Sequence, residues 1–244
     1  MKLRIKFRKY GNMKFIGHLD VMRYFQKAIR RAEIDIRYSE GFSPHQIMSF
    51  AAPLGVGITS NGEYVDIDLL SMESPEDVKK RLSRAMTEGF EIADVRLLPD
   101  SAGNAMSQVA AADYTVRLRP GYEMDRPLEW MRGLADFYRQ PSILVKKKTK
   151  KGEKELDLKP LVYELVVCVD EPVPYLFMRI SNGSAANIKP ELVLDAYYAS
   201  LGQERPAFGW LQQREEVYAD TASEEERLEG RHRFVSLMEL NQEA

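Results

Sequence analysis

Two hydrophobic periods alternate along this chain, and their order limits the folds that it can adopt. Segments with an apolar side chain at every second position are typical of half-buried strands, and segments with an apolar side chain at every third or fourth position are typical of helices. In the first 99 residues we interpret the order as strand, helix, strand, strand, helix, strand, which is the order of a ferredoxin-like sandwich. The clearest segments are 2–10, 18–34, 63–70, 74–86 and 91–98.

The same order recurs in the second part of the chain. Strand and helix patterns follow one another at 113–120, 126–140, 161–169, 175–181, 189–202 and 208–219. Between the first helix and the next strand, the stretch SILVKKKTKKGEKELDLKP is typical of an inserted hairpin that turns near Lys151-Gly152. The chain therefore predicts an α+β protein of two tandem ferredoxin-like (βαββαβ) sandwich domains, with a lysine-rich hairpin inserted in the second.

Domain boundaries follow from this order. We expect a first domain over 1–99 and a second over 113–219. The stretch from Pro99 to Ala112 has no convincing period, so it is interpreted as a linker, and 220–244 as an acidic C-terminal tail.

Cysteine and hydropathy exclude several classes of protein. Cys168 is the only cysteine in the sequence, so there is no disulfide framework and no thiolate cluster for zinc or iron–sulfur binding. The charged N-terminal residues do not lead into an apolar leader segment, and no apolar run reaches the length of a membrane span. We expect a cytoplasmic protein with no membrane association, no metal and no cofactor; the sequence leaves its oligomeric state open.

Charge is distributed unevenly although the net charge is only −2. Residues 1–50 contain eleven Lys and Arg against four Asp and Glu, whereas 215–244 contain nine acids against three Arg. Such asymmetry is typical either of a charged binding face or of solvated surface.

Cations of the first half form the main candidate site for nucleic acid. On the first strand they alternate with apolar residues, and on the first helix they form a stripe opposite the apolar face. If the two sets meet, they line one groove that neutralises phosphates, which is how most nucleic-acid affinity arises. The predicted binding residues are Lys2, Arg4, Lys6, Arg8, His18, Arg23, Lys27, Arg30 and Arg31.

The lysine hairpin is a second candidate for the same chemistry. A two-stranded arm with this charge can reach a nucleic acid or a partner protein, or it can protect a sheet edge from aggregation. The residues concerned are Lys146, Lys147, Lys148, Lys150 and Lys151.

The stretch IRYSEGFSPHQIMSFAAPLGVG, residues 36–57, lacks any period and is rich in glycine and proline. His45 lies in it and is the candidate catalytic residue, as a general base or a phosphate donor; a structural hydrogen bond is the other interpretation. The predicted contact residues of this loop are Tyr38, Ser39, Gly41, Phe42, Ser43 and Pro44.

The first 180 residues resemble the radical SAM-linked family of uncharacterised bacterial proteins. The resemblance rests on the GHLDVMR helix start, the YSEGFSPHQIMSFAAPLGVG loop and the KKGEKELDLKP hairpin. Positions that match the family pattern are His18, Asp20, Arg23, Arg31, Tyr38, Gly41, Phe42, Pro44, His45 and Gly55.

The resemblance implies a companion of radical SAM enzymes, because such proteins also occur fused C-terminal to radical SAM and cobalamin-binding proteins, often beside genes for RNA processing. It supplies no catalytic residues. A radical SAM enzyme needs three closely spaced cysteines for its cluster, and this chain has one, so the chain is not the radical enzyme.

These observations lead to one main hypothesis and two alternatives. The main hypothesis is a non-catalytic accessory protein that binds RNA, or presents a substrate, for a radical SAM partner in RNA processing or modification. The alternatives are a metal-independent RNA-cleaving or RNA-modifying enzyme that uses His45, and a protein-interaction module without any role in nucleic-acid binding.

Overall fold

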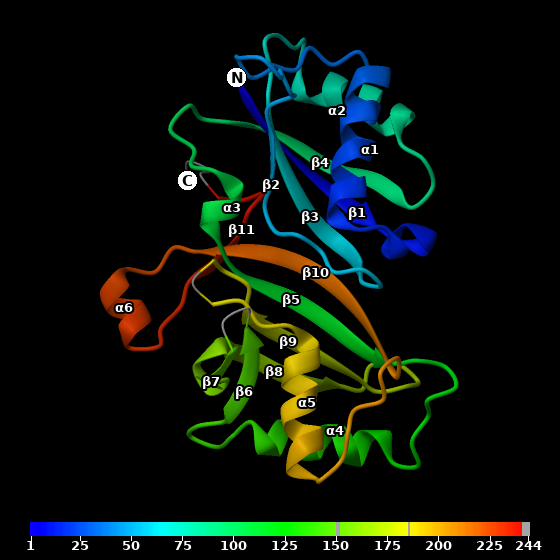
Figure 1. Cartoon of the computed structure of the whole chain (residues 1–244), viewed down its shortest axis with the longest axis vertical. Coiled ribbons are helices and arrows are strands. Elements are labelled where there is room, and N and C mark those ends of the chain that lie inside the picture. The colour runs from blue at the N-terminus through cyan, green and yellow to red at the C-terminus, as the bar shows by residue number, and fades with distance from the viewer. Residues whose placement is uncertain (150–151, 185, 241–244) are drawn as a thin grey trace.

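One mixed β-sheet runs through the whole molecule (Figure 1). The structure is a computed structural model that describes residues 1–149, 152–184 and 186–240. Within these residues the strand order is β4-β1-β3-β10-β5-β9-β8, with β2 beside β3 and β11 beside β10. The strands are β1 (Lys2–Lys9), β2 (Met48–Phe50), β3 (Thr59–Asp68), β4 (Phe90–Leu98), β5 (Val109–Leu118), β8 (Val162–Cys168), β9 (Tyr175–Ser181), β10 (Trp210–Asp220) and β11 (Phe234–Ser236).

Helices cover one face of this sheet. In the first half α1 and α2 pack on it, and in the second half α4 and α5 do so (Figure 1). The described residues contain six α-helices: α1 (His18–Arg31), α2 (Pro75–Ala85), α3 (Ala105–Gln108), α4 (Pro127–Phe137), α5 (Pro190–Ser200) and α6 (Glu224–Leu228). Short 3-10 turns occur at η1 (Gly11–Phe15) and η2 (Lys159–Leu161).

The core of the first half forms as the alternation predicts. Leu3, Ile5 and Phe7 of β1 point to the same face and pack against Phe25 and Ile29 of α1. The start of α2 is also as predicted, because the Ser74 side chain accepts a hydrogen bond from the Asp77 backbone N–H at 3.1 Å.

The second half adds a hairpin to the same plan. Strands β6 (Leu144–Thr149) and β7 (Gly152–Asp157) pair antiparallel between α4 and β8, which confirms the predicted insertion. Val145 and Leu156 pack against the core of the second half. The turn predicted at Lys151 lies outside the described residues.

An α+β protein was predicted, and this is confirmed. In each half the strands lie in the order fourth, first, third, second: β4-β1-β3-β2 and then β10-β5-β9-β8, with antiparallel neighbours. The halves share one sheet, because β3 pairs with β10 in parallel. That each half is a ferredoxin-like domain stays a prediction.

Two connecting segments differ from expectation. The predicted linker 99–112 contains α3 and the first residues of β5, so it is part of the fold. The segment predicted as an acidic tail is folded as far as it is described: α6 carries a capping box at Ser223 and Glu226, and β11 pairs with β10.

Among the described residues, no helix combines the length and the hydrophobicity that crossing a bilayer requires.

Candidate nucleic-acid interface

The cations of β1 and those of α1 lie on opposite faces of the sheet. Because Leu3, Ile5 and Phe7 face α1, the alternate residues of β1 face the other side. The expectation that both sets line one groove is therefore wrong. The residues on the far face are Lys2, Arg4, Lys6 and Arg8.

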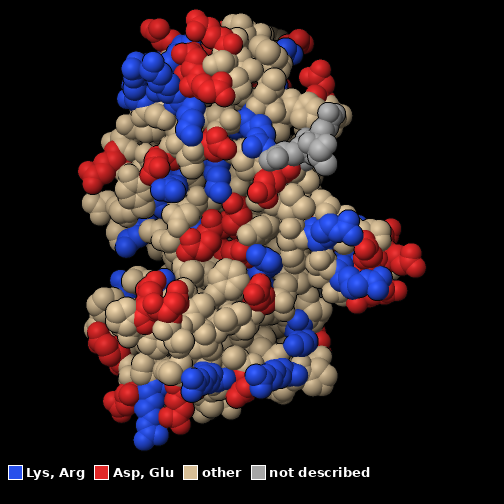
Figure 2. Space-filling view, turned by 180° about the vertical axis from the view of Figure 1, so that it is seen from behind, with Lys and Arg blue, Asp and Glu red and all other residues tan. Residues whose placement is uncertain are grey.

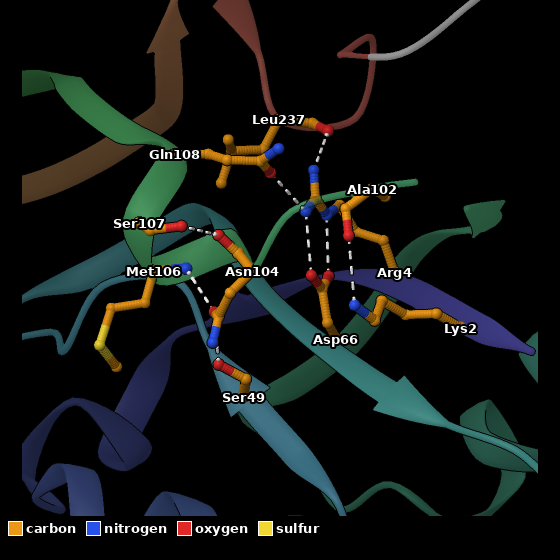
Figure 3. A network of polar contacts seen from close by, with 10 residues as sticks. All are labelled: Lys2, Arg4, Ser49, Asp66, Ala102, Asn104, Met106, Ser107, Gln108 and Leu237. Carbon is orange, nitrogen blue, oxygen red and sulfur yellow. Dashed lines mark hydrogen bonds and ion pairs between the residues drawn. The ribbon is translucent and has the colours of Figure 1, made fainter. Parts of the chain in front are cut away.

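Arg4 is completely buried, although its position in the alternation predicted an exposed side chain. Its guanidinium forms a two-pronged pair with Asp66, at 2.8 and 2.9 Å. It also donates to the backbone carbonyl of Leu237 at 2.7 Å and to the Gln108 side chain at 3.0 Å (Figure 3). Arg4 thus fastens α3 and the C-terminal segment to the sheet, and it does not face solvent.

Lys6 and Arg8 of this strand border a groove of mixed charge, whereas Lys2 donates to the Ala102 carbonyl at 3.3 Å. Lys6 forms an ion pair with Glu216 at 2.5 Å, and Arg8 lies 3.4 Å from Glu91. The groove has a volume of about 680 Å³ and is also lined by Lys79, Asp94, Arg96, Glu215 and Glu239. Figure 2 shows this face of the molecule, where Lys and Arg alternate with Asp and Glu. Because acids match the cations, the groove does not favour a polyanion.

The cationic stripe of α1 is exposed as predicted. Arg23, Lys27 and Arg30 recur at steps of four and three residues and are exposed. Arg23 forms an ion pair with Asp20 at 3.4 Å. Arg31 is also exposed but donates to the Ala85 carbonyl at 2.8 Å, toward the end of α2.

The loop that follows α1 docks beside this stripe. Tyr38 and Gln46 pair across the base of the loop. The Gln46 side chain donates to the Gln26 carbonyl on α1 at 3.3 Å and to the Tyr38 hydroxyl at 3.4 Å. Residues three and four apart are neighbours on a helix surface, so Arg23 and Arg30 flank this docking point.

His45 closes the loop. Its Nδ1 lies 2.8 Å from the Ser39 hydroxyl, and its backbone N–H donates to that hydroxyl at 3.1 Å. Neighbouring side chains alternate in extended backbone, so His45 and Ser39 point away from the side on which Gln46 meets α1. The geometry is that of a structural hydrogen bond, and a catalytic role for His45 stays a prediction.

The tip of the loop is exposed. Gly41 has φ +106, a conformation that favours glycine, and Phe42 beside it is fully exposed. The predicted contacts Ser43 and Pro44 are exposed as well. We call the combined face the helix–loop surface, consisting of Arg23, Lys27, Arg30, Tyr38 and Phe42.

The lysine hairpin does not extend this surface. Figure 1 shows β6 and β7 in the second half, away from α1 in the first. Lys146 is exposed. Lys147 and Lys148 lie on β6, but their side chains are outside the described part, as are Lys150 and Lys151 altogether.

A buried group of charges lies where the two halves meet, and no sequence pattern predicted it. Arg214 of β10 pairs with Glu63 of β3 at 3.1 Å and donates to the Tyr114 hydroxyl at 3.1 Å. Lys9, at the end of β1, is also buried and donates to the Ile16 carbonyl at 3.0 Å. We call Lys9, Glu63 and Arg214 the seam cluster. With Lys9 protonated, its two cations and one carboxylate carry one excess positive charge.

Burial shifts the pKa values of the seam cluster. It lowers the pKa of Lys9, an effect that Glu63 opposes and Arg214 strengthens. It raises the pKa of Glu63, with Arg214 and Ser60 acting in the other direction. It also lowers the pKa of His18, which stands at the start of α1, and the charge of Lys9 adds to that shift. His18 therefore contributes little positive charge to a phosphate site.

The second part of the stretch 36–57 covers the seam cluster. The carbonyls of Ala52 and Pro53 accept hydrogen bonds from Arg214 at 3.3 and 3.4 Å. Residues 36–57 therefore do two things: the first part docks on α1, and the second part closes the seam over buried charge. In the described part of the chain, no group of three or more His, Cys, Asp or Glu side chains is arranged to hold a metal ion.

Fold and surface together define a mixed α+β protein with one sheet through two similar halves and a cationic helix flanked by a docked loop. The sequence profile of one family matches residues 2–190, and its description is "Uncharacterized protein conserved in bacteria (DUF2344)". The chain belongs to this bacterial family. The match gives no evidence of a link to radical SAM enzymes.

Comparisons with other proteins add little. No curated protein matches the sequence. One solved structure with similar architecture is "Crystal Structure of a Cbf5-Nop10-Gar1 Complex", with 10% identity and a TM-score of 0.48. The match covers 88% of this chain and 48% of that chain, so the present chain spans about half the length of its structural neighbour. No functional argument rests on a likeness of this size.

Proposed function

We propose that the protein binds single-stranded RNA on the helix–loop surface and presents it to a radical SAM enzyme. One observation carries the RNA part: the contact of Gln46 with the Gln26 carbonyl places exposed aromatic side chains beside the cationic stripe of α1. Proteins that bind single-stranded nucleic acid combine cations that follow the backbone with aromatic rings on which bases stack.

Charge balance supports this surface over its rivals. On the stripe Asp20 pairs with Arg23, whereas Lys27 and Arg30 form no ion pair among the described residues. The groove on the opposite face contains as many acids as cations. Arg23, Lys27 and Arg30 neutralise backbone phosphates, and Tyr38 and Phe42 supply rings for stacking.

The radical SAM partner rests on the sequence resemblance. Cys168 is the only cysteine, so the iron–sulfur cluster belongs to the partner, which would also bind cobalamin. In this proposal the present chain contributes no cofactor and no catalytic group, acts in the bacterial cytoplasm, and brings the RNA to the partner's active site.

The two halves support a further structural proposal. We infer that 1–99 and 113–219 are tandem ferredoxin-like units, joined edge to edge through β3 and β10. The repeated strand order supports this, as do two helices on the same face of each half.

The test of RNA binding is anisotropy of a labelled single-stranded RNA with the full chain, across about 50 to 200 mM salt. We expect binding at low salt and a steep loss of affinity as salt rises. No binding at the lowest salt, or a salt slope near zero, would overturn the proposal.

The partner is tested separately, by co-purification of the tagged chain with and without nuclease. A radical SAM protein that is recovered only while RNA is intact supports presentation through RNA. Recovery that survives nuclease, combined with no RNA binding by the isolated chain, would instead favour the protein-interaction alternative.

A further inference from the structure

A second cleft lies on the face of the sheet opposite to the helix–loop surface. Its volume is about 630 Å³, and it opens between β8, β9 and the segment from α6 to β11. Arg179 of β9 lies on this side because it pairs with Asp113, whose neighbours Ala112 and Tyr114 face the helices. The lining includes the cations and rings Lys159, Tyr163, Arg179, Arg227, His232 and Phe234.

A histidine in this cleft is held by a buried aspartate. His232 Nδ1 lies 2.8 Å from Asp220 Oδ2, and Asp220 is only 5% exposed. The other oxygen of Asp220 accepts hydrogen bonds from the backbone N–H groups of Ala222 and Arg233, each at 3.0 Å. The carboxylate is therefore fixed, and it fixes the orientation of the ring.

The aspartate also sets the tautomer of His232. Burial acts to raise the pKa of Asp220, but hydrogen bonds from His232 and from two backbone N–H groups outweigh it, so the pKa is lowered. An ionised carboxylate only accepts, so Nδ1 of His232 carries the proton and Nε2 of the neutral ring is an acceptor. Among the described residues no protein group bonds to Nε2, and the side chain is 21% exposed.

Three aromatic rings form a wall of the cleft. The ring centres of Tyr163 and His232 are 4.6 Å apart, and those of Tyr163 and Phe234 are 4.8 Å apart. His232 and Phe234 stack with an interplanar angle of 9° at 5.3 Å. Half-buried rings of this kind present faces or edges to a flat ligand.

Three cations and three acids lie around these rings: Lys159, Arg179 and Arg227 against Glu164, Asp113 and Asp220. Among the described residues, Lys159 and Arg227 form no ion pair. Arg179 is held by both oxygens of Asp113, at 2.7 and 2.8 Å, and is 25% exposed. Lys159 donates to the Tyr138 carbonyl at 2.6 Å, and Arg227 is exposed with one long contact to the Asp220 carbonyl at 3.5 Å. Glu164 is the acid of the lining, 3.8 Å from Arg179.

We propose that this cleft binds a nucleotide. The base lies against Tyr163 and Phe234, the ribose hydroxyl donates to His232 Nε2, and the phosphate binds Arg227 with support from the charges of Lys159 and Arg179. The combination carries the proposal: an acceptor fixed by Asp220, a ring wall, and two cations, Lys159 and Arg227, that form no ion pair among the described residues, in one cleft of sufficient volume.

The test uses the full chain and three probes: AMP, adenosine and inorganic phosphate, each titrated by calorimetry. We expect AMP to bind more tightly than either fragment. Arg227→Gln should weaken AMP by about tenfold and leave adenosine unchanged, because only the phosphate loses a partner. His232→Ala should weaken both AMP and adenosine. Arg8→Gln, on the same face but outside the cleft, is the control.

A second readout covers the case in which His232→Ala fails to fold. In the wild-type chain, the ring resonances of His232 should shift on addition of AMP, and those of His45 should not. Unchanged His232 resonances at saturating AMP, or phosphate binding as tightly as AMP, would overturn the proposal. Nucleotide binding in the cleft and RNA binding on the helix–loop surface can be tested independently. Arg227→Gln leaves the helix–loop surface intact, and Lys27→Gln leaves the cleft intact.

Discussion

Lys9 is a cation on the core-facing side of β1. It continues the alternation that runs from Leu3 to Phe7, and it is buried within the seam cluster beside Glu63 and Arg214. Its ammonium donates to one carbonyl, that of Ile16. A cation with so few partners is costly to bury.

Stability should therefore depend on pH through Lys9. Because its pKa is lowered in the fold, the unfolded chain binds the proton more readily between the lowered pKa and about 10.4, and stability rises with pH across that interval. Lys9→Met keeps the length of the side chain and should remove this rise. The measurement is the free energy of unfolding in urea for both proteins, from neutral to alkaline pH. The difference between the two free energies is compared, because tyrosines titrate in both proteins. A difference in the free energy of unfolding that does not change with pH would contradict the lowered pKa of Lys9.

At the residue scale, the sequence predicted which way the side chains of β1 point but not what covers them. Lys2, Lys6 and Arg8 do lie on the face away from α1. Arg4 lies there too, but α3 and the C-terminal segment cover it. Its partners Gln108 and Leu237 are more than 100 residues away, so no local pattern could reveal them. His232 was missed for another reason: its partner Asp220 is only 12 residues away, but the segment that contains both was interpreted as a tail.

The loop from Tyr38 to Gln46 is the element on which the candidate surface depends. Gln46 donates one hydrogen bond to the Gln26 carbonyl of α1 and one to the Tyr38 hydroxyl within the loop, while Gln46 Oε1 is buried without a partner among the described residues. A buried acceptor without a partner makes the contact less stable than a fully paired one.

Gln46→Ala should release the loop without changing any charge. We expect faster amide hydrogen exchange over 38–46, unchanged exchange in α1, and weaker RNA binding because Tyr38 and Phe42 lose their position. Ser101→Ala, at an exposed position outside the loop, is the control and should change none of the three. Unaltered exchange in Gln46→Ala would show that other contacts hold the loop.

Elements with clear periods were predictable and those without were not. The predicted helices at 18–34 and 74–86 correspond to α1 and α2, because apolar spacing marks both and the Ser74 cap marks the start of α2. The short elements β2, α3 and β11 have three or four residues each, too few to show a period. They form because longer strands offer them edges and faces.

The molecule as a whole depends on the seam between its halves. The parallel ladder between β3 and β10 contains two residue pairs, Thr59 with Gln213 and Ser60 with Arg214, and the side-chain pair of Glu63 with Arg214 adds to it. Gly62 lies just beyond them, where a Cβ atom would come within 2.7 Å of the Glu215 carbonyl oxygen and 2.9 Å of the Glu216 Cα. The close approach of the two backbones requires glycine there.

Gly62→Ala should therefore destabilise the protein by about 1–3 kcal/mol, because backbone atoms cannot yield as a flexible side chain can. The measurement is thermal unfolding, where each kcal/mol corresponds to about 2–4 °C in Tm for a chain of this size. Gly17→Ala has open space around the new methyl group and should cost less than about 1 kcal/mol. Equal effects of the two substitutions would contradict the seam as described.

The single sheet could not be read from the sequence. Each half shows its own strand and helix periods, but the pairing of β3 with β10 joins residues about 150 positions apart. The same pairing assembles Glu63 and Arg214, so the seam cluster was as unpredictable as the sheet.

The most direct test of the central claim compares the salt dependence of RNA binding for cations on the two faces. Lys27→Gln/Arg30→Gln removes two charges from the helix–loop surface, and Arg8→Gln/Arg96→Gln removes two from the opposite face. The slope of log K against log salt is negative, and each single-strand phosphate contact contributes about 0.7 to its magnitude. We predict that the first variant reduces this magnitude by about 1.4 and that the second leaves it unchanged. Equal slopes for wild type and both variants, or a loss confined to the second, would contradict the assignment of RNA binding to α1 and its loop.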